Sequence, residues 1–432
     1  MRTIGQHRDE VAALLAPVLA ERGAETVALD ALADGVGTGR GYRVLAHGVT
    51  APVPLPVFDN SQMDGFAVRS TEAGDVVRVV DPIPAGAVPV PLEPGTAAPI
   101  MTGARIPDGA DAVVPVEATL PGAFPAALDL DVLAVPDGTT AGVFVRRVGS
   151  DVARGAGLAR AGDPVTPALL GALASAGVGA VSVVRPVRVL VVSTGSELAD
   201  GGARDDGGAQ DDGGARDDGG ARDDGLDGAG AVIRDANGVA LRAALAEVGA
   251  EARGVRLSDA AEAFLPGLES AVGGWADLVL TTGGISAGAY EVVRQVLEPR
   301  GLVVTPVAMQ PGGPQALGRV ELAGRRVPVV AFPGNPVSAL VSFEVFLRPV
   351  LAAAVGAPDR PTAELPAAES AESPVGKHQV RRGRVADGRV HFVGGPSSHL
   401  LGHLAAATHL VHVPLGTDTV APGDPLTVWS LR

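Results

Sequence analysis

The chain of 432 residues contains no cysteine, and this absence limits its chemistry. It excludes disulfides, a thiolate nucleophile, and zinc or iron–sulfur sites with cysteine ligands. Any catalysis must rest on carboxylates, hydroxyls, backbone amides, arginine or a bound metal. Lysine is nearly absent too: Lys377 stands alone against 33 arginines, which indicates a general bias toward arginine. Aromatic residues make up only 3% of the chain, so aliphatic side chains must build the cores.

The net charge limits the partners of the chain. A formal charge of −15 and a pI near 5.0 argue against an electrostatic grip on nucleic acid or on an anionic membrane. Part of this charge is local, because residues 200–227 hold ten Asp against three Arg. The rest of the chain is therefore only mildly acidic.

Neither a targeting segment nor a membrane span is expected. Residues 1–19 are interrupted by charged residues at 8–10 and lack the apolar core of a signal peptide. The most apolar long run, residues 337–356, is interrupted by Glu344 and Arg348, which favours a packed helix over a membrane span. We therefore expect a cytoplasmic protein, and the length predicts about two to four domains.

An acidic repeat stands apart from the rest. Residues 201–224 hold four copies of the unit Gly-Gly-Ala-Arg/Gln-Asp-Asp. With so few apolar residues, the segment cannot offset the entropy lost on ordering. We interpret residues 200–228 as a disordered insertion. Calcium binding by the Asp pairs is a weaker alternative, because such sites need spaced ligands around a defined turn.

The apolar pattern changes along the chain. Apolar residues at 11, 14, 15, 18 and 19 predict an amphipathic N-terminal helix, and residues 24–185 read as β-rich with many turns. Strands and helices then alternate, which predicts a parallel sheet with helices on both faces. A linker is expected at 358–374 and a small all-β region from 379 to 431. The alternating elements are strands at 187–192, 252–257, 277–281 and 327–332, and helices at 235–248, 259–272, 290–297 and 337–355.

Residues 277–291 read as strand, glycine loop and helix, and the loop is a candidate anion site. Such a loop lies at the carboxyl end of a strand, where ligands bind in open parallel sheets. The glycine loop, with Gly283 and Gly284, leaves backbone N–H groups free to bind an anion. Ser286 adds a hydroxyl and Glu291 adds a carboxylate. Two further polar loops, at 193–197 and 333–338, also follow strands. Each loop alone is weak evidence for a ligand site. Because all three follow strands of one predicted sheet, we expect them to converge on one crevice.

Acidic residues surround these loops. Glu197, Asp235 and Glu291 would repel one another beside a bound phosphate unless Mg²⁺ bridged them. Asp235 also opens a predicted helix and could serve as its N-cap. Both roles are compatible.

Three polar strings lie in the β-rich region, at 56–69, 99–104 and 107–114. Turns held by Asn and Asp would account for them in structural terms. Taken together with the loops above, however, the chain resembles the MoeA and gephyrin E-domain family of molybdopterin molybdenumtransferases over nearly its whole length, the acidic repeat excepted.

The resemblance implies an α/β multidomain fold and a homodimer. It comprises an elongated β-rich N-terminal region, an α/β/α parallel-sheet domain of the molybdopterin-binding type and a small C-terminal β-barrel. The implied divisions are domain I at 1–26, 46–53 and 148–186, domain II at 27–45 and 54–147, domain III at 187–356 and domain IV at 357–432.

The resemblance also implies an activity: molybdenum from molybdate is inserted into adenylated molybdopterin with Mg²⁺, and AMP is released. Asp59 and Thr102 would reach the cleft from the partner subunit, and Glu291 and Asp235 would hold Mg²⁺. The molybdopterin adenylyltransferase that supplies the substrate is a further expected partner. By matching position, the remaining site residues are Arg147, Asp151, Glu197, Ser286, Gln310, Pro333, Pro336, Ser338, Arg382 and Ser398, together with Gly283 and Gly284.

Two departures from the family pattern concern charge. Where the family commonly has Lys-Pro-Gly-Lys-Pro, this chain has Gln310-Pro311-Gly312-Gly313-Pro314. Arginine was available and was not used, so the compositional bias does not explain the loss. Each missing charged hydrogen bond should weaken oxyanion binding by about 1–3 kcal/mol. Glu291 also replaces the usual Asp, which moves its carboxylate outward by one methylene.

Two alternatives to the transferase remain open. The missing lysines would fit a non-catalytic molybdopterin-binding or scaffold paralogue that kept the fold. A nucleotide pyrophosphatase similar to CinA would keep the nucleotide pocket alone, but the strings around Asp59 and Thr102 argue against it.

Overall fold

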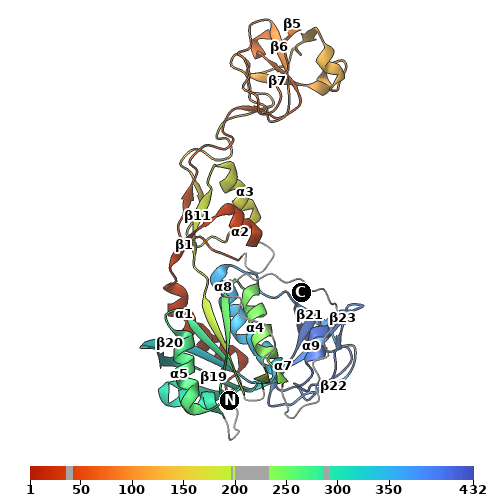
Figure 1. The fold of residues 1–432 in the computed structure, drawn as a ribbon. Helices are drawn as coiled ribbons and strands as arrows, with labels where there is room; N and C mark the ends of the chain where they lie inside the picture. The colour runs from red at the N-terminus through yellow and green to blue at the C-terminus, as the bar shows by residue number, and fades with distance from the viewer. Residues whose placement is uncertain (36–41, 196–197, 200–232, 286–290) are drawn as a thin grey trace, which may run out of the picture. The chain divides into compact units, whose positions relative to one another are not determined.

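The computed structural model describes residues 1–35, 42–195, 198–199, 233–285 and 291–432. The acidic repeat lies outside these ranges. The chain divides into two compact units, drawn in Figure 1. The first combines Met1–Glu25, Asp34–Val44 and Val184–Arg432, and the second combines Thr26–Ala33 with Leu45–Val183. We describe each unit by itself.

A six-stranded sheet organises the first unit, in the order β15-β12-β16-β20-β19-β17. The expected parallel arrangement is confirmed for the first four strands of this order. β19 is antiparallel to β20 and β17, which corrects the expectation of a wholly parallel sheet. The strands are β12 (Arg188–Thr194), β15 (Glu251–Leu257), β16 (Leu278–Thr282), β17 (Leu302–Pro306), β19 (Pro314–Leu322) and β20 (Arg325–Phe332).

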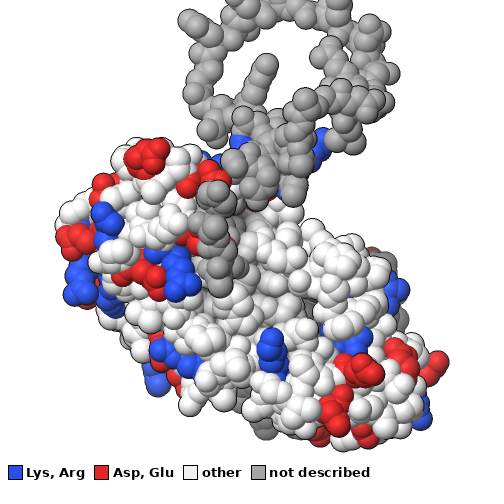
Figure 2. Space-filling model, turned by 90° about the horizontal axis from the view of Figure 1, so that it is seen from below, with Lys and Arg blue, Asp and Glu red and all other residues white. Residues whose placement is uncertain are grey.

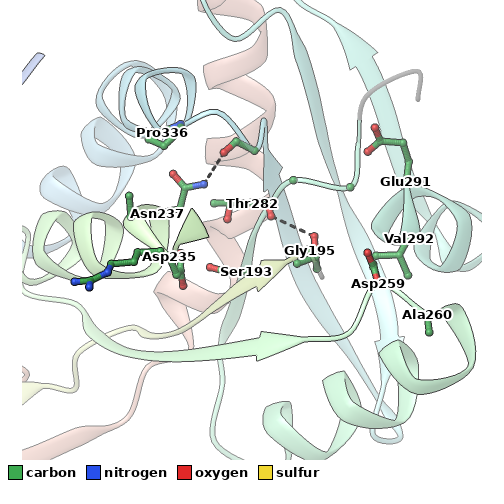
Figure 3. Close-up of a pocket in the computed structure, with 16 residues that line it drawn as sticks. Ser193, Gly195, Asp235, Asn237, Asp259, Ala260, Thr282, Glu291, Val292 and Pro336 are labelled. Carbon is green, nitrogen blue, oxygen red and sulfur yellow. Dashed lines mark hydrogen bonds between the residues drawn. The ribbon is translucent and has the colours of Figure 1, made fainter. Parts of the chain in front are cut away.

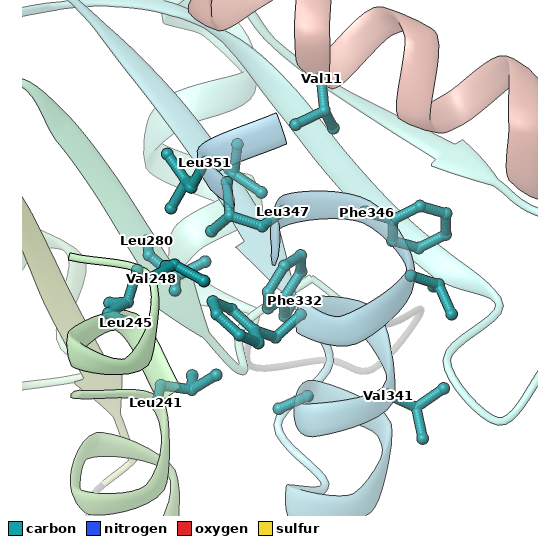
Figure 4. Packing of buried hydrophobic residues seen from close by; sticks show 14 of the residues in the cluster. Val11, Leu241, Leu245, Val248, Leu280, Phe332, Val341, Phe346, Leu347 and Leu351 are labelled. Atoms are coloured by element: carbon teal, nitrogen blue, oxygen red, sulfur yellow. The ribbon is translucent and has the colours of Figure 1, made fainter. Parts of the chain in front are cut away.

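Helices cover both faces of this sheet. Leu241 and Leu245 of α4 (Ala236–Glu247) pack on one face with Val189 and Val191 of β12, in the cluster shown in Figure 4. On the other face, α5 (Ala261–Val272) and α6 (Val292–Leu297) pack against the alternate residues of the same strand. The continuous aliphatic run of β12 follows from this double burial.

The N-terminal helix α1 (Ile4–Ala20) packs into the core of the first unit. Thr3 and Gln6 form a capping box at its start, and Val11, Leu14 and Leu15 join the cluster on the α4 side of the sheet. Residues 1–26 were expected in an N-terminal domain I. The apolar face of α1 is buried against the sheet, and the division into domains I to IV stays a prediction.

His7 of α1 is fully buried in this core. Its ring meets the edge of Phe346 at 4.7 Å between centroids, and neither ring nitrogen has a hydrogen-bond partner within the described chain. Burial, with a smaller effect of Arg2, lowers the pKa of His7 from 6.5 to about 4. Between pH 4 and pH 6.5 the imidazole is therefore neutral in the folded protein but protonated in the unfolded chain.

This burial predicts acid sensitivity. As the pH falls from 6.5 toward 4, His7 binds a proton in the unfolded chain but not in the folded protein. The free energy of unfolding should therefore decrease by about 3 kcal/mol. His7→Phe should remove that contribution and stabilise the protein at pH 5. Urea denaturation at pH 5 and 7.5 measures both effects, with the exposed His399→Gln as control. An unchanged pH dependence in His7→Phe would contradict the assignment.

The long apolar run is one continuous helical segment. It comprises α7 (Pro336–Ser342), a π-helical turn (Phe343–Leu347) and α8 (Arg348–Val355). It is long and apolar enough to cross a membrane, but 67% of its most apolar window is buried in the core. Glu344, inside this run, is paired with Arg360 at 2.8 Å. The expected packed helix is confirmed.

A second sheet contains the C-terminal strands, in the order β18-β23-β25-β27-β21, with β24 paired to β23. Its edge strand β18 (Met309–Gln310) comes from the preceding α/β segment. The linker expected at 358–374 is in fact partly β-structured, because β21 and β22 lie within it. The elements are β21 (Thr362–Pro366), β22 (Ala371–Glu372), β23 (His378–Ala386), β24 (Arg389–Phe392), α9 (Leu401–Ala406), β25 (His409–Val413), β26 (Thr419–Val420) and β27 (Pro425–Ser430).

The charges on the face seen in Figure 2 are mixed in sign. Acidic and basic side chains alternate within each charged area, and uncharged residues fill a broad surface between these areas. Interspersed charges of both signs leave no large single-sign field on this face.

The second unit confirms the β-rich expectation. A five-stranded sheet has the order β7-β4-β6-β5-β8. Gly65 on β4 could not be another residue without movement, because a Cβ there would lie 2.1 Å from the Val114 carbonyl oxygen. The strands are β4 (Gly65–Val68), β5 (Val76–Val79), β6 (Thr96–Ile100), β7 (Ala112–Pro115) and β8 (Val132–Ala134).

The second unit also contains a smaller hydrophobic cluster. Leu29, Leu32 and Leu45 pack with Leu170 and Val183 rather than with the five-stranded sheet. The expected assignment of residues 27–45 to domain II stays a prediction. The elements outside the sheet are β1 (Ala24–Ala28), α2 (Leu29–Gly35), β2 (Val49–Thr50), β3 (Asn60–Ser61), β9 (Val145–Arg146), β10 (Gly157–Ala159), α3 (Pro167–Ser175) and β11 (Ala180–Val184).

Candidate functional site

A cavity of about 850 Å³ lies at the carboxyl ends of the parallel strands β12, β15, β16 and β20. β12 leads through α4 to β15 on one side, and its other neighbour is β16, so the strand order reverses beside it. Ligands of open α/β sheets bind at such a reversal. The cavity is lined by Ser193, Thr194, Gly195, Arg234, Asp235, Ala236, Asn237, Asp259, Ala260, Thr282, Gly283, Gly284, Glu291, Val292, Gly334 and Pro336 (Figure 3).

Glycines bring two of the loops into contact. A Cβ on Gly334 would lie 3.1 Å from the Cα of Gly283, so the loops after β16 and β20 meet backbone to backbone. Gly283 and Gly284 have φ angles of +84° and +69°, which a side chain would strain. The amide of Arg294 donates to the Gly284 carbonyl at 2.9 Å and ties the loop to α6. The sequence-based expectation of converging glycine loops is confirmed for these residues.

The start of α4 forms one wall of the cavity. Asp235 caps the helix by accepting a hydrogen bond from the Gly238 amide at 2.8 Å, as its alternative role predicted. The Nδ2 of Asn237 donates to the Gly334 carbonyl at 2.7 Å and fixes this wall to the loop after β20. Asn237 was missed in the sequence, although its place two residues after a predicted cap could have indicated it.

Two carboxylates lie on the opposite wall. Figure 3 shows Glu291 at the start of α6 with Asp259 on its side of the cavity, across from Asp235. Asp259 lies two residues after the end of β15 and was not among the expected site residues. Its place after a predicted parallel strand is the one signal in the sequence that points to it, and that signal alone is weak.

Buried polar atoms also belong to residues that line the cavity. The hydroxyls of Ser193 and Thr282 and the Oδ1 of Asn237 are shielded from solvent and have no hydrogen-bond partner within the described parts of the chain. An unsatisfied buried polar group costs about 1–3 kcal/mol. A ligand with a polar edge would remove that cost.

The loop that carries Gln310 is held against α7. The Nε2 of buried Gln315 donates to the Gly312 carbonyl at 2.8 Å and to the Ser342 hydroxyl at 2.7 Å. Gln310 itself accepts a hydrogen bond from Gln379 at 2.9 Å. Ser338 is buried in the first turn of α7, where Asn335 caps the helix through the Val337 and Ser338 amides. Pro333 is buried just after β20, and Pro336 is the first residue of α7.

Arg382 is buried and fully engaged by one loop. Its guanidinium donates to the carbonyls of Val393, Gly395 and Ser397, the last at 3.0 Å, and burial lowers its pKa. Arg381 stacks on Phe392 with its guanidinium carbon 4.1 Å from the ring centre. The structure thus places Arg382 under the loop that leads to Ser398.

The second unit brings together two of the expected site residues, Asp59 and Arg147. Their side chains form an ion pair at 2.8 Å, and the Val148 amide donates to the same carboxylate at 2.6 Å. Thr102 donates from both its amide and its hydroxyl to Asp64, which therefore has a lowered pKa and was missed in the sequence. Asp151 is exposed, and its amide donates to the Leu55 carbonyl at 3.0 Å.

The Asp59 pair predicts a pH-dependent stability. Burial would raise the pKa of Asp59, but the Val148 and Arg147 hydrogen bonds outweigh it and lower the pKa below the ordinary value. The stabilisation is complete above the pKa of unfolded Asp and is lost as pH falls through the folded value. Asp59→Asn should cost about 1 kcal/mol at pH 7, since the pair is partly exposed, and less at pH 3, which lies below the pKa of Asp in the unfolded chain. Urea denaturation at pH 7 and pH 3 measures the free energy of unfolding of Asp59→Asn, with the exposed Asp81→Asn as control. An equal loss of stability at both pH values would contradict this prediction.

Two expected site residues, Glu197 and Ser286, lie outside the described residues. Of the others in the first unit, Asp235, Gly283, Gly284, Glu291 and Pro336 line the cavity, whereas Gln310, Pro333, Ser338, Arg382 and Ser398 are not among its lining residues.

Comparisons with known proteins identify the family. Residues 3–177 match the model of the MoeA N-terminal region (domain I and II), and residues 190–353 match that of a probable molybdopterin binding domain. The chain is 41% identical over 407 residues to molybdopterin molybdenumtransferase 2 of Mycobacterium tuberculosis, covering 90% of this chain and 92% of that protein.

More distant relatives agree with this match. Molybdopterin molybdenumtransferase of Synechococcus elongatus is 33% identical over 90% of this chain and 92% of its own length. In fold, a crystal structure of a molybdopterin biosynthesis MoeA protein from Pyrococcus horikoshii has a TM-score of 0.70 at 22% identity, with all of both chains covered. The chain belongs to the MoeA family of molybdopterin molybdenumtransferases.

Proposed function

We propose that this chain is a molybdopterin molybdenumtransferase, which inserts molybdenum from molybdate into adenylated molybdopterin and releases AMP in molybdenum cofactor biosynthesis. The observation that carries the proposal is the cavity at the strand-order reversal, with touching glycine loops on its floor and carboxylates on facing walls. The 41% identity over 90% of the chain to a molybdenumtransferase supports it.

In this proposal the cavity receives the nucleotide and pterin. Backbone amides of the loop at Gly283 and Gly284 face phosphate oxygens, and the polar atoms of Ser193, Thr282 and Asn237 pair with the polar edge of the substrate. Asp235 and Glu197 complete this part of the site. Molybdate is placed toward Ser286 and Gln310, with Pro333, Pro336, Ser338 and Ser398 around it. Arg382 positions the loop of Ser398 through its three carbonyl contacts.

A homodimer would complete the site in this proposal. Asp59 and Thr102 of one subunit then reach the cleft of its partner. Arg147 and Asp151 of the same subunit as Asp59 support them. The ion pair between Asp59 and Arg147 and the two hydrogen bonds that Thr102 donates to Asp64 hold these side chains in defined positions. We place the enzyme in the cytoplasm, with the molybdopterin adenylyltransferase as the donor of its substrate.

The residues of the cavity fit a Mg²⁺ that is held largely by the substrate. Glu291 and Asp235 offer carboxylate oxygens, but within the described ranges three or more acidic or histidine ligands do not gather closely enough to form a protein-only metal site. Mg²⁺ is usually bound by one or two carboxylates together with substrate phosphates and water. When bound, the ion would neutralise the charge that develops on the phosphates.

The chain's own groups then have defined tasks. The loop amides orient the phosphoanhydride, and the glycine contact keeps their direction fixed. Attack by a water or molybdate oxygen cleaves the bond to AMP.

The test is release of AMP from adenylated molybdopterin by the full chain. We expect release to require molybdate and Mg²⁺ together, since both enter the proposed reaction. Equal release without molybdate would favour a pyrophosphatase similar to CinA instead, a function that would leave the match over residues 3–177 unexplained. Substrate binding without any AMP release would favour the scaffold alternative. The missing cations at 310 and 313 are the observation that supports that alternative.

A further inference from the structure

A second cavity of the first unit is separate from the substrate cavity. It has a volume of about 350 Å³ and lies between the first turns of α1 and the C-terminal sheet. Its described lining contains no acidic side chain. The residues are Thr3, Ile4, Gly5, Arg8, Ala308, His378, His412, Leu415 and Trp429.

Two histidines form the polar part of its wall. The Nε2 of His378 and the Nδ1 of His412 are 3.0 Å apart and share one proton in a hydrogen bond. His412 is only 6% exposed, and its Nε2 has no partner among the described residues. If His378 donates the shared proton, His412 carries its own proton on Nε2 and has a free donor.

Positive potential gathers at the same place. The guanidinium of Arg8 forms no ion pair with any residue that the structure describes. The first turn of α1, a helix of 17 residues, contributes the positive end of its dipole. Burial, with His378 and Arg8 as smaller causes, lowers the pKa of His412 to about 3, so the imidazole is neutral at pH 7 and Arg8 is the cation of the cavity.

The rest of the lining suits a flat apolar body. The ring of Trp429 lies 4.3 Å from that of His412 between centroids, and Ile4, Ala308 and the half-exposed Leu415 supply aliphatic surface. An arginine, a buried imidazole donor and an aromatic face together recognise a carboxylate attached to a ring.

We propose that this cavity binds a small aromatic carboxylate, with the carboxylate on Arg8 and the Nε2–H of His412 and the ring beside Trp429. The site lies on the other face of β23 from Gln379, because His378 and Gln379 are successive residues of that strand. It is therefore distinct from the contact between Gln379 and Gln310.

Trp429 provides the reporter that tests this proposal. The chain has two tryptophans, so Trp275→Phe leaves Trp429 as the only one. In this variant of the full chain, benzoate should change the Trp429 emission in a saturable way, and the neutral isostere benzamide should bind at least about tenfold more weakly. No response to benzoate, or equal responses to both compounds, would overturn the proposal.

Variants at Arg8 then locate the binding. Arg8→Gln should weaken benzoate binding about tenfold or more, Arg8→Lys should weaken it less, and the exposed Arg389→Gln should leave it unchanged. Far-UV circular dichroism confirms that each variant is folded, and His412→Phe offers a second removal of a donor. Unaltered affinity in folded Arg8→Gln and His412→Phe would show that benzoate binds elsewhere.

Discussion

Glu291→Gln is expected to reduce AMP release by about two to three orders of magnitude while adenylated molybdopterin still binds. Glutamine keeps the shape of the side chain at the start of α6 but removes the charge that the proposed Mg²⁺ requires. Loss of one preorganised electrostatic contact commonly costs a factor of about 10² to 10³. The measurement is the initial rate of AMP release at saturating molybdate and over a range of Mg²⁺ concentrations.

A matched control separates charge at this position from charge in general. Glu262→Gln removes a carboxylate from the exposed first turn of α5, which does not line the cavity. Its rate should equal that of the wild type. Glu291→Asp should retain activity, because it restores the acid that the family pattern has. Full activity in Glu291→Gln would remove this residue from the metal site.

Gln310→Lys combined with Gly313→Lys is expected to lower the KM for molybdate by about one to two orders of magnitude. Each new cation should add a charged hydrogen bond to the oxyanion, worth about 1.5–3 kcal/mol before the cost of ordering the side chain. The backbone allows the change at 313: a Cβ there would have its closest contacts at 3.4 Å, in the carbonyls of Met309 and Val307. AMP release as a function of molybdate concentration gives the KM.

Bulk without charge is the control for this pair. Gln310→Met with Gly313→Met fills similar space and should leave the KM unchanged or raise it. If the lysine pair behaves like the methionine pair, the molybdate lies elsewhere. If only the lysine pair is active, the chain in its present form is better described as the non-catalytic alternative.

The sequence predicted the central part of the fold because its signals were local and consistent. β12 is aliphatic at every core position, glycines follow β16 and β20, and Asp235 precedes a helical pattern. Gly283 and Gly284 stand at positions with a positive φ angle, and Asp235 stands at the N-cap of α4. Asp259 was missed because a single acid after a strand does not differ from an ordinary turn residue until the fold places it in the cavity.

Expectations that depended on long-range packing were less successful. Nothing local distinguishes a parallel from an antiparallel neighbour, so the direction of β19 had to come from its pairing with β20. The proline-rich composition of 358–374 concealed β21, whose pairing with β27 lies far along the chain. Nothing in the sequence indicated that the guanidinium of Arg382 donates to the carbonyls of a loop eleven to fifteen residues away.

The edge strand β18 makes the C-terminal region inseparable from the α/β segment. Met309 and Gln310 pair with His378 and Gln379 of β23, so residue 310 is held in place by a strand that comes later in the chain. A protein ending at residue 356 would keep every lining residue of the substrate cavity yet lose the partner of β18. Exchange of the C-terminal sheet between relatives would thus alter the surroundings of Gln310, where we propose that molybdate binds, even though no residue of the cavity changed.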